Sequence, residues 1–269
     1  PSGQSAPSGQ IVDAQSNGWS GRGWAHTESS PPLRAGGIAA LGIVMAVVLS
    51  TVVGVAWLAA GGKDSDPIGI LLSEIGLWAG LIGACALASR RKGTGHLLAD
   101  FDARIAGWRD VAIGLGASVV GRFAAAIVVV VLVALGGQSF SGTNDTNLTQ
   151  SHTVIGLVVS GLLLCVGAPI VEELFFRGLV QGSLTVRFGV GWGIWLQACL
   201  FGLVHVQPNL GRANITVILG IATFGLMQGW LRNRFGRLGP GIVAHSLFNL
   251  VAFIAIVVSG MAQLPLHML

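Results

Sequence analysis

The sequence has very little charge, because Asp, Glu, Lys and Arg make up only 10% of its 269 residues. Soluble domains carry about 25% charged residues, whereas this chain is 52% apolar and has a mean hydropathy of +0.75. The shortage of charge excludes an ordinary soluble domain and predicts an integral membrane protein. The net charge of +4 does not indicate nucleic acid binding, because the basic residues lie beside apolar stretches, where they set membrane topology.

Cysteine and tyrosine are also scarce. The three cysteines, Cys85, Cys165 and Cys199, each lie inside an apolar stretch, so their spacing predicts neither a disulfide framework nor a zinc-binding motif. Tyrosine is absent and arginine outnumbers lysine 13 to 2. This bias is typical of GC-rich bacterial genomes, and we expect a bacterial plasma membrane as the location.

Seven apolar stretches each approach the ~20 residues that a helix needs to span a bilayer. They predict an all-α, polytopic transmembrane helix bundle with about seven spans. An eighth span, or a re-entrant helix near residues 177–192, is an open alternative. The stretches cover residues 37–60, 68–89, 111–135, 154–176, 190–209, 215–231 and 240–259.

The N-terminal region differs from the rest of the chain. Residues 1–36 are rich in Gly, Ser, Pro and Gln and contain no apolar run, so we expect a disordered tail before a transmembrane domain over residues 37–269. If the tail lies in the cytoplasm, eleven Lys and Arg residues fall on the cytoplasmic side and only Lys63 and Arg212 on the other. Positive residues favour the cytoplasmic side, so we expect this topology.

The stretch VEELFFRG, residues 171–178, places two acidic residues and an arginine next to the fourth apolar stretch. Each charge inside a membrane costs roughly 2.5–3.5 kcal/mol on insertion scales. Glu173 and Arg177 are four residues apart and can form an ion pair on one face of a helix. Glu172 lies about 140° around the helix from Arg177, so it has no partner there and is the better candidate for a proton-exchanging carboxylate. The alternative is that both glutamates are solvated at a helix end.

Two further apolar stretches carry polar groups at helical spacing. In FGLVH, Phe201 lies one turn before His205, and in HSLFN, His245 lies one turn before Asn249. Such groups can stabilise an oxyanion or hold membrane helices together. For a straight helix that starts near residue 190, His205 would lie ~20 Å into the membrane, deeper than Glu172. Convergence of these groups therefore requires a tilt, a kink or a re-entrant segment.

Other polar residues in apolar stretches give weaker indications. Glu74 is expected near the membrane interface, and Arg122 is expected to reach the interface or to pair inside the protein. Gln197 and Gln228 are expected to form hydrogen bonds between helices.

The three polar stretches together resemble the motifs of a known protein family. The chain lacks an HExxH motif, a P-loop and a nucleophile elbow, so a carboxylate with histidines is more suited to activating water than to covalent catalysis. EELFFRG fits the pattern EExxxR, FGLVH fits FxxxH and HSLFN fits HxxxN. In this order they resemble the CPBP family of intramembrane proteases, which includes the type II CAAX prenyl proteases. The resemblance covers about residues 150–260, the expected catalytic core.

The resemblance implies an intramembrane endopeptidase that hydrolyses membrane-embedded or lipid-anchored proteins or peptides. It implies that Glu172 is the general base and that His205 helps to activate the water. His245 and Asn249 would then stabilise the oxyanion. The residues expected to support the site are Glu173, Arg177 and Phe201.

The cofactor and the function each have alternatives. We favour a mechanism without a cofactor, but zinc bound by Glu172, His205 and His245 is the alternative for the metal. Buried glutamate and histidine residues also serve proton movement, so a transporter or proton-relay protein is a second functional class. A scaffold or immunity protein of the same fold is a third.

Overall fold

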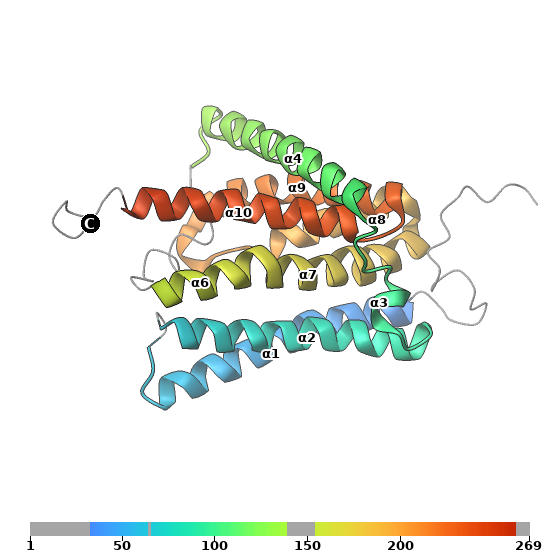
Figure 1. Ribbon diagram of the computed structural model, residues 1–269, viewed down its shortest axis with the longest axis horizontal. Helices are drawn as coiled ribbons and strands as arrows, with labels where there is room; N and C mark the ends of the chain where they lie inside the picture. The colour runs from blue at the N-terminus through green and yellow to red at the C-terminus, as the bar shows by residue number, and fades with distance from the viewer. Residues whose placement is uncertain (1–32, 64–65, 139–153, 262–269) are drawn as a thin grey trace, which may run out of the picture.

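The computed structural model describes residues 33–63, 66–138 and 154–261, and its regular secondary structure in these ranges is entirely helical (Figure 1). The predicted all-α fold is confirmed. Most of the expected tail, residues 1–36, lies outside the described residues, and its last four residues belong to the first helix. The helices are α1 (Leu33–Ala59), α2 (Pro67–Lys92), α3 (Leu97–Asp100), α4 (Trp108–Ala134), α6 (Val154–Leu162), α7 (Ala168–Glu172), α8 (Gln181–Leu203), α9 (Asn214–Phe235) and α10 (Gly239–Met261).

Three further helical segments are not α-helical. The π-helical segments η1 (Leu163–Gly167) and η2 (Glu173–Val180) join α6, α7 and α8, and the 3₁₀ segment η3 (Pro208–Ala213) precedes α9. Within the described ranges, six helical segments are long and apolar enough to cross a membrane, as expected for an integral membrane protein. Five correspond to single predicted spans, and the sixth, Val154–Leu203, contains two of them.

Gly189 divides this 50-residue segment into two antiparallel arms. Its φ of +83° lies in a region that glycine adopts readily and other residues do not. The arms pack closely, because a Cβ added at Gly193 would lie 3.0 Å from the Cα of Thr185, and the rings of Phe176 and Phe201 are 5.1 Å apart. The helical arm continues past residue 176, where the fourth apolar stretch ends, to the turn at Gly189, which lies in the range left open for a re-entrant helix.

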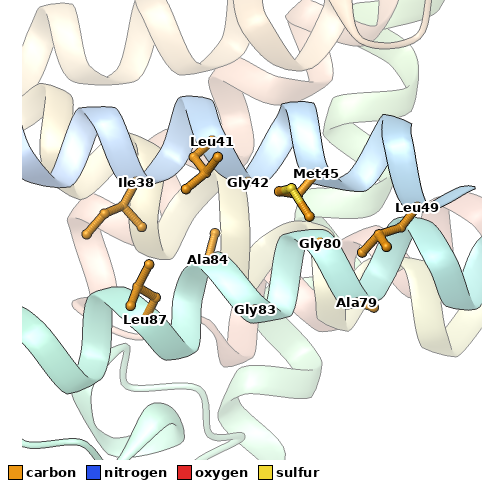
Figure 2. A pocket seen from close by; sticks show the side chains of 10 residues that line it. All are labelled: Ile38, Leu41, Gly42, Met45, Leu49, Ala79, Gly80, Gly83, Ala84 and Leu87. Carbon is orange, nitrogen blue, oxygen red and sulfur yellow. The ribbon is translucent and has the colours of Figure 1, made fainter.

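Helices α1 and α2 lie side by side along one edge of the bundle (Figure 1). Their backbones approach each other closely at Gly80 and Ala46, since a Cβ added at Gly80 would lie 2.2 Å from the backbone nitrogen of Ala46. Small residues allow this close approach in lipid. An apolar groove follows the same seam, as Figure 2 shows, and it is lined by Ile38, Leu41, Gly42, Met45, Leu49, Ala79, Gly80, Gly83, Ala84 and Leu87.

The centre of the bundle lies around η2, whose eight residues are all buried. Phe175 and Leu179 are completely inaccessible, and the Sγ of Cys85 in α2 lies 3.7 Å from the carbonyl oxygen of Leu174. Because η2 contains all of the EELFFRG residues except Glu172, the fold buries most of this charged stretch inside the bundle rather than leaving it solvated at a helix end.

One end of the bundle, here called the basic end, is where residues 93–107 meet the α9–α10 turn. Both α2 and α9 finish there with basic residues in the last turn. The backbone N–H of Leu238 donates to the carbonyl of Asp102 at 3.0 Å, and Nη2 of Arg237 lies 2.5 Å from Oδ1 of Asp110. The carboxylate of Asp110 accepts hydrogen bonds from Arg237, which raises the pKa of that arginine.

Asp100 anchors the loop at the basic end. Its carboxylate accepts hydrogen bonds from the Ser89 hydroxyl, from Oγ1 of Thr94 at 2.7 Å and from the N–H of Gly95 at 3.2 Å. Burial acts to raise the pKa of Asp100, but these hydrogen bonds outweigh it and hold the pKa below the usual range of an aspartate. The loop is therefore fixed to the end of α2 by an ionised, buried carboxylate.

Candidate active site

Glu173 and Arg177 form the ion pair that their spacing predicted. Nη1 of Arg177 lies 3.1 Å from Oε1 of Glu173, and both side chains are at most 1% exposed. The guanidinium also lies 4.1 Å from the ring centroid of Phe201, close enough for a cation–π contact. The predicted ion pair is confirmed, and the ring of Phe201, in the second arm, packs against the guanidinium of Arg177.

Glu173 has two further partners on other helices. Its Oε1 lies 3.0 Å from Nδ1 of His245 in α10 and accepts a hydrogen bond from Nε2 of Gln228 in α9 at 3.1 Å. Gly241 permits this contact, because a Cβ there would lie 3.0 Å from Oε2 of Glu173. The sequence indicated only the local partner of Glu173, since nothing in it says which helix faces this carboxylate.

Glu172 lies on the other side of the same imidazole. Its Oε2 is 3.8 Å from Nε2 of His245, and 19% of its side chain is exposed, compared with 1% for Glu173. His245 therefore lies between two carboxylates, with one ring nitrogen facing each. Glu172 is the more accessible of the two acids and has no ion-pair partner on its own helix within the described residues, as its helical position predicted.

His205 reaches this region through the turn at Gly189. Its Nδ1 lies 2.6 Å from the carbonyl oxygen of Phe201, and the two rings are 4.9 Å apart. The Phe201 ring is also 5.8 Å from the ring of His245. The expected difference in depth disappears, because nearly equal lengths of chain separate Gly189 from Glu172 and from His205, and the two arms run side by side.

Asn249 lies one turn beyond His245 on α10. Its Nδ2 donates to the carbonyl oxygen of Leu164 at 2.8 Å, in the π-helical segment η1. Among the described residues, no hydrogen bond or ion pair joins Asn249 or His205 to Glu172. The structure thus brings Glu172, Glu173 and His245 into direct contact, connects His205 through Phe201, and places Asn249 at the next turn.

One comparison with known proteins found a matching family. Residues 154–251 match the family model described as type II CAAX prenyl endopeptidase Rce1-like. We refer to this matched stretch, residues 154–251, as the Rce1-like domain. The match confirms the resemblance to the CPBP family that the motifs carried. A search of curated proteins and a search of solved structures gave no match.

Polar residues outside the three motifs also contact the Rce1-like domain or lie within it. Glu74 of α2 is close enough to Glu172 for the two carboxylates to interact electrostatically, which no motif indicated. The guanidinium of Arg122 donates to the carbonyl of Phe248 and lies 4.3 Å from its ring centroid, so Arg122 pairs inside the protein. Gln228 bonds between helices as predicted.

Zinc bound by Glu172, His205 and His245 was the expected alternative for the metal. In the described part of the chain, no group of three or more His, Cys, Asp and Glu side chains is arranged to hold a metal ion. Nδ1 of His205 faces a backbone carbonyl and Nδ1 of His245 faces Glu173, so Nε2 is the ring nitrogen of each histidine that is left for a further ligand. Zinc bound by Glu172, His205 and His245 stays the alternative to a mechanism without a cofactor.

Proposed function

We propose that this protein is an intramembrane endopeptidase in which Glu172 activates a water molecule for attack on a peptide bond. The observation that carries the proposal is the position of His245 between two buried or half-buried carboxylates. One carboxylate, Glu173, is satisfied by neighbouring donors, whereas Glu172 is left partly exposed. A carboxylate that accepts no hydrogen bond from the described residues is suited to removing a proton from water.

The neighbouring groups have complementary roles in this proposal. Nδ1 of His205 is engaged by the Phe201 carbonyl, which leaves Nε2 as the acceptor for a hydrogen of the attacking water. An asparagine amide has two N–H donors, so Asn249 can hold Leu164 with one and donate to the developing oxyanion with the other. The proton that Glu172 takes from water then passes to the leaving amine.

The surroundings support a substrate within or anchored to the membrane. The candidate site lies in a bundle with six apolar segments of spanning length among the described residues, which favours a substrate that is itself in the membrane. We propose membrane-embedded or lipid-anchored proteins or peptides as the substrate class. Since the basic end collects the arginines that end α2 and α9, we also propose that this end faces the cytoplasm.

The test compares cells that express the wild type with cells that express Glu172→Gln. N-terminal proteomics of their membranes should show at least one membrane protein that is cleaved in the wild type and accumulates uncleaved in the variant. The loss of a general base should reduce cleavage by roughly 10²- to 10⁴-fold. Because the Glu172 side chain is partly exposed, the variant should keep the wild-type unfolding temperature, which controls for misfolding.

Two results would contradict the proposal. Undiminished cleavage by Glu172→Gln would exclude this residue as the base. Absence of any cleavage difference, together with Glu172-dependent proton flux in proteoliposomes, would favour the proton-relay alternative instead.

A further inference from the structure

Gln228 connects the carboxylate of Glu173 to α10. Its Nε2 donates to Oε1 of Glu173 at 3.1 Å and to the carbonyl oxygen of Gly241 at 2.9 Å. Gly241 lies one helical turn before His245, and Gln228 itself is completely buried. The amide of Gln228 therefore holds Glu173 and the first turn of α10 at a fixed separation.

The position of Glu173 determines which ring nitrogen of His245 carries the hydrogen. A carboxylate paired with an arginine is ionised and can only accept hydrogen bonds, so the hydrogen between Glu173 and His245 belongs to Nδ1 of the imidazole. A hydrogen bond to one ring nitrogen sets the role of the other. Nε2 is then the nitrogen that faces Glu172, 3.8 Å away.

Arg177 competes for the same carboxylate. Its three guanidinium nitrogens are buried and make no well-aligned hydrogen bond with the described residues, although Nη1 lies 3.1 Å from Glu173. Arginine prefers two parallel hydrogen bonds to a carboxylate. Without Gln228, Glu173 would be free to rotate toward Arg177 and away from Nδ1 of His245.

We infer that Gln228 is a positioning residue, which holds Glu173 against Nδ1 of His245 and so fixes the ring orientation and the tautomer of His245. The tautomer of His245 can be measured whether or not the protein cleaves peptides. The expected effect of Gln228 on catalysis rests on the proposed function. Gln228 belongs to none of the three motifs, and no part of its role requires contact with substrate.

Gln197 provides a matched control. It is also a completely buried glutamine, and its Nε2 likewise donates to a backbone carbonyl of a neighbouring helix, that of Gly225 at 2.9 Å. It has no hydrogen bond or ion pair with Glu173 in the described structure. Gln197→Met and Gln228→Met therefore remove similar buried amides, but only Gln228→Met frees Glu173.

The experiment has a spectroscopic and a kinetic arm. In protein labelled with ¹⁵N-histidine, the His245 resonances are assigned by their loss in His245→Gln, and their shifts report which ring nitrogen carries hydrogen. We expect Gln228→Met to change the His245 nitrogen shifts and Gln197→Met to leave them as in the wild type. A displaced catalytic group should lower kcat by about 10- to 100-fold in Gln228→Met, with KM unchanged, on the membrane protein that accumulates in Glu172→Gln cells.

The outcomes separate this inference from the proposed function. Wild-type His245 shifts in Gln228→Met, or equal changes in both methionine variants, would overturn the positioning role. If the wild type cleaves no membrane protein, the proposed function fails, while the nitrogen shifts still decide whether Gln228 sets the tautomer.

Discussion

Residues 33–92 and residues 154–261 pack their helices with the same small side chains, but they bury different kinds of group between them. In the α1–α2 pair, Gly80 meets the backbone of Ala46, and the groove beside this seam is apolar. In the second region, Gly225 meets Ala198 in the same manner, yet the interior also contains an ion pair and a histidine between two carboxylates.

The two regions therefore have different packing requirements. Contact between small residues is enough to hold two membrane helices together, as α1 and α2 demonstrate. Buried charges add cost unless each finds a partner, and in the second region the partners come from several helices, as with Glu173. The polar contacts there fix which side chains face one another, a requirement that the α1–α2 pair does not have.

The largest expected effect on stability comes from breaking the buried ion pair. Arg177→Met leaves Glu173 ionised and buried without its cation, which should lower the free energy of unfolding by about 3–5 kcal/mol. Denaturant unfolding in detergent measures this loss. Arg234→Met, at an exposed position of the basic end, is the control, and an equal loss in both variants would contradict the importance of the pair.

The α1–α2 contact should be sensitive to size rather than to charge. Gly80→Val forces a side chain against the backbone of Ala46 and should cost about 1–3 kcal/mol of unfolding free energy. At Gly83, on the same helix, an added Cβ meets nothing within 4 Å, so Gly83→Val should cost much less. If the two variants unfold alike, close approach at Gly80 is not what holds this pair.

A smaller effect on stability is expected at Asp100, in the loop of the basic end between the two regions. Asp100→Asn removes the charge that accepts the Ser89, Thr94 and Gly95 hydrogen bonds and should cost about 1 kcal/mol at neutral pH. Because the pKa of Asp100 is lowered in the folded protein, its stabilisation is present above the ordinary aspartate pKa and is lost as the pH falls through the lowered value. The difference between variant and wild type should therefore shrink in acid.

Unfolding measured at neutral and at acidic pH tests this dependence. Asp102→Asn is the control, because that carboxylate pairs with the exposed Arg104 at 3.6 Å and takes no part in the hydrogen bonds to Asp100. A cost for Asp100→Asn that stays constant with pH would show that its charge does not stabilise the loop.

The smallest expected effect is that of metal removal. Cleavage should be unchanged by 1,10-phenanthroline, because no group of described residues is arranged to hold a metal ion. Inhibition that is reversed by added zinc would instead place the second region among metal-dependent sites.

Hydropathy and short-range spacing predicted the parts of this protein that depend on neighbouring residues. Apolar length located the spans, and the four-residue spacing predicted the ion pair of Glu173 with Arg177. The reversal at Gly189 could not be predicted in the same way, because the chain contains 41 glycines and hydropathy does not distinguish one with positive φ. A re-entrant helix near residues 177–192 and a kink before His205 were left open, but the residue at which the chain reverses was not identified, so the depth of His205 could not be matched to that of Glu172.

The contacts that the site residues make with other helices could not be predicted from the sequence either. Gln228 was expected to bond between helices, but its acceptor, Glu173, depends on the rotation of α9 about its axis. The contact between Glu173 and His245 depends in turn on the close approach at Gly241. Helical spacing constrains which residues share a face and leaves open which helix that face meets.

The π-helical segments on either side of α7 contain turns that each hold one residue more than an α-helical turn. Deletion of one residue from η1, such as Val166, would therefore convert that turn to α-helix and leave the residues after it in nearly the same orientation relative to α6, so that Glu172 still faces His245. A deletion between Gly189 and His205 removes no such extra residue and would rotate His205 by about 100° about the axis of α8. We therefore expect the segment before Glu172 to tolerate a single-residue deletion that the segment before His205 does not.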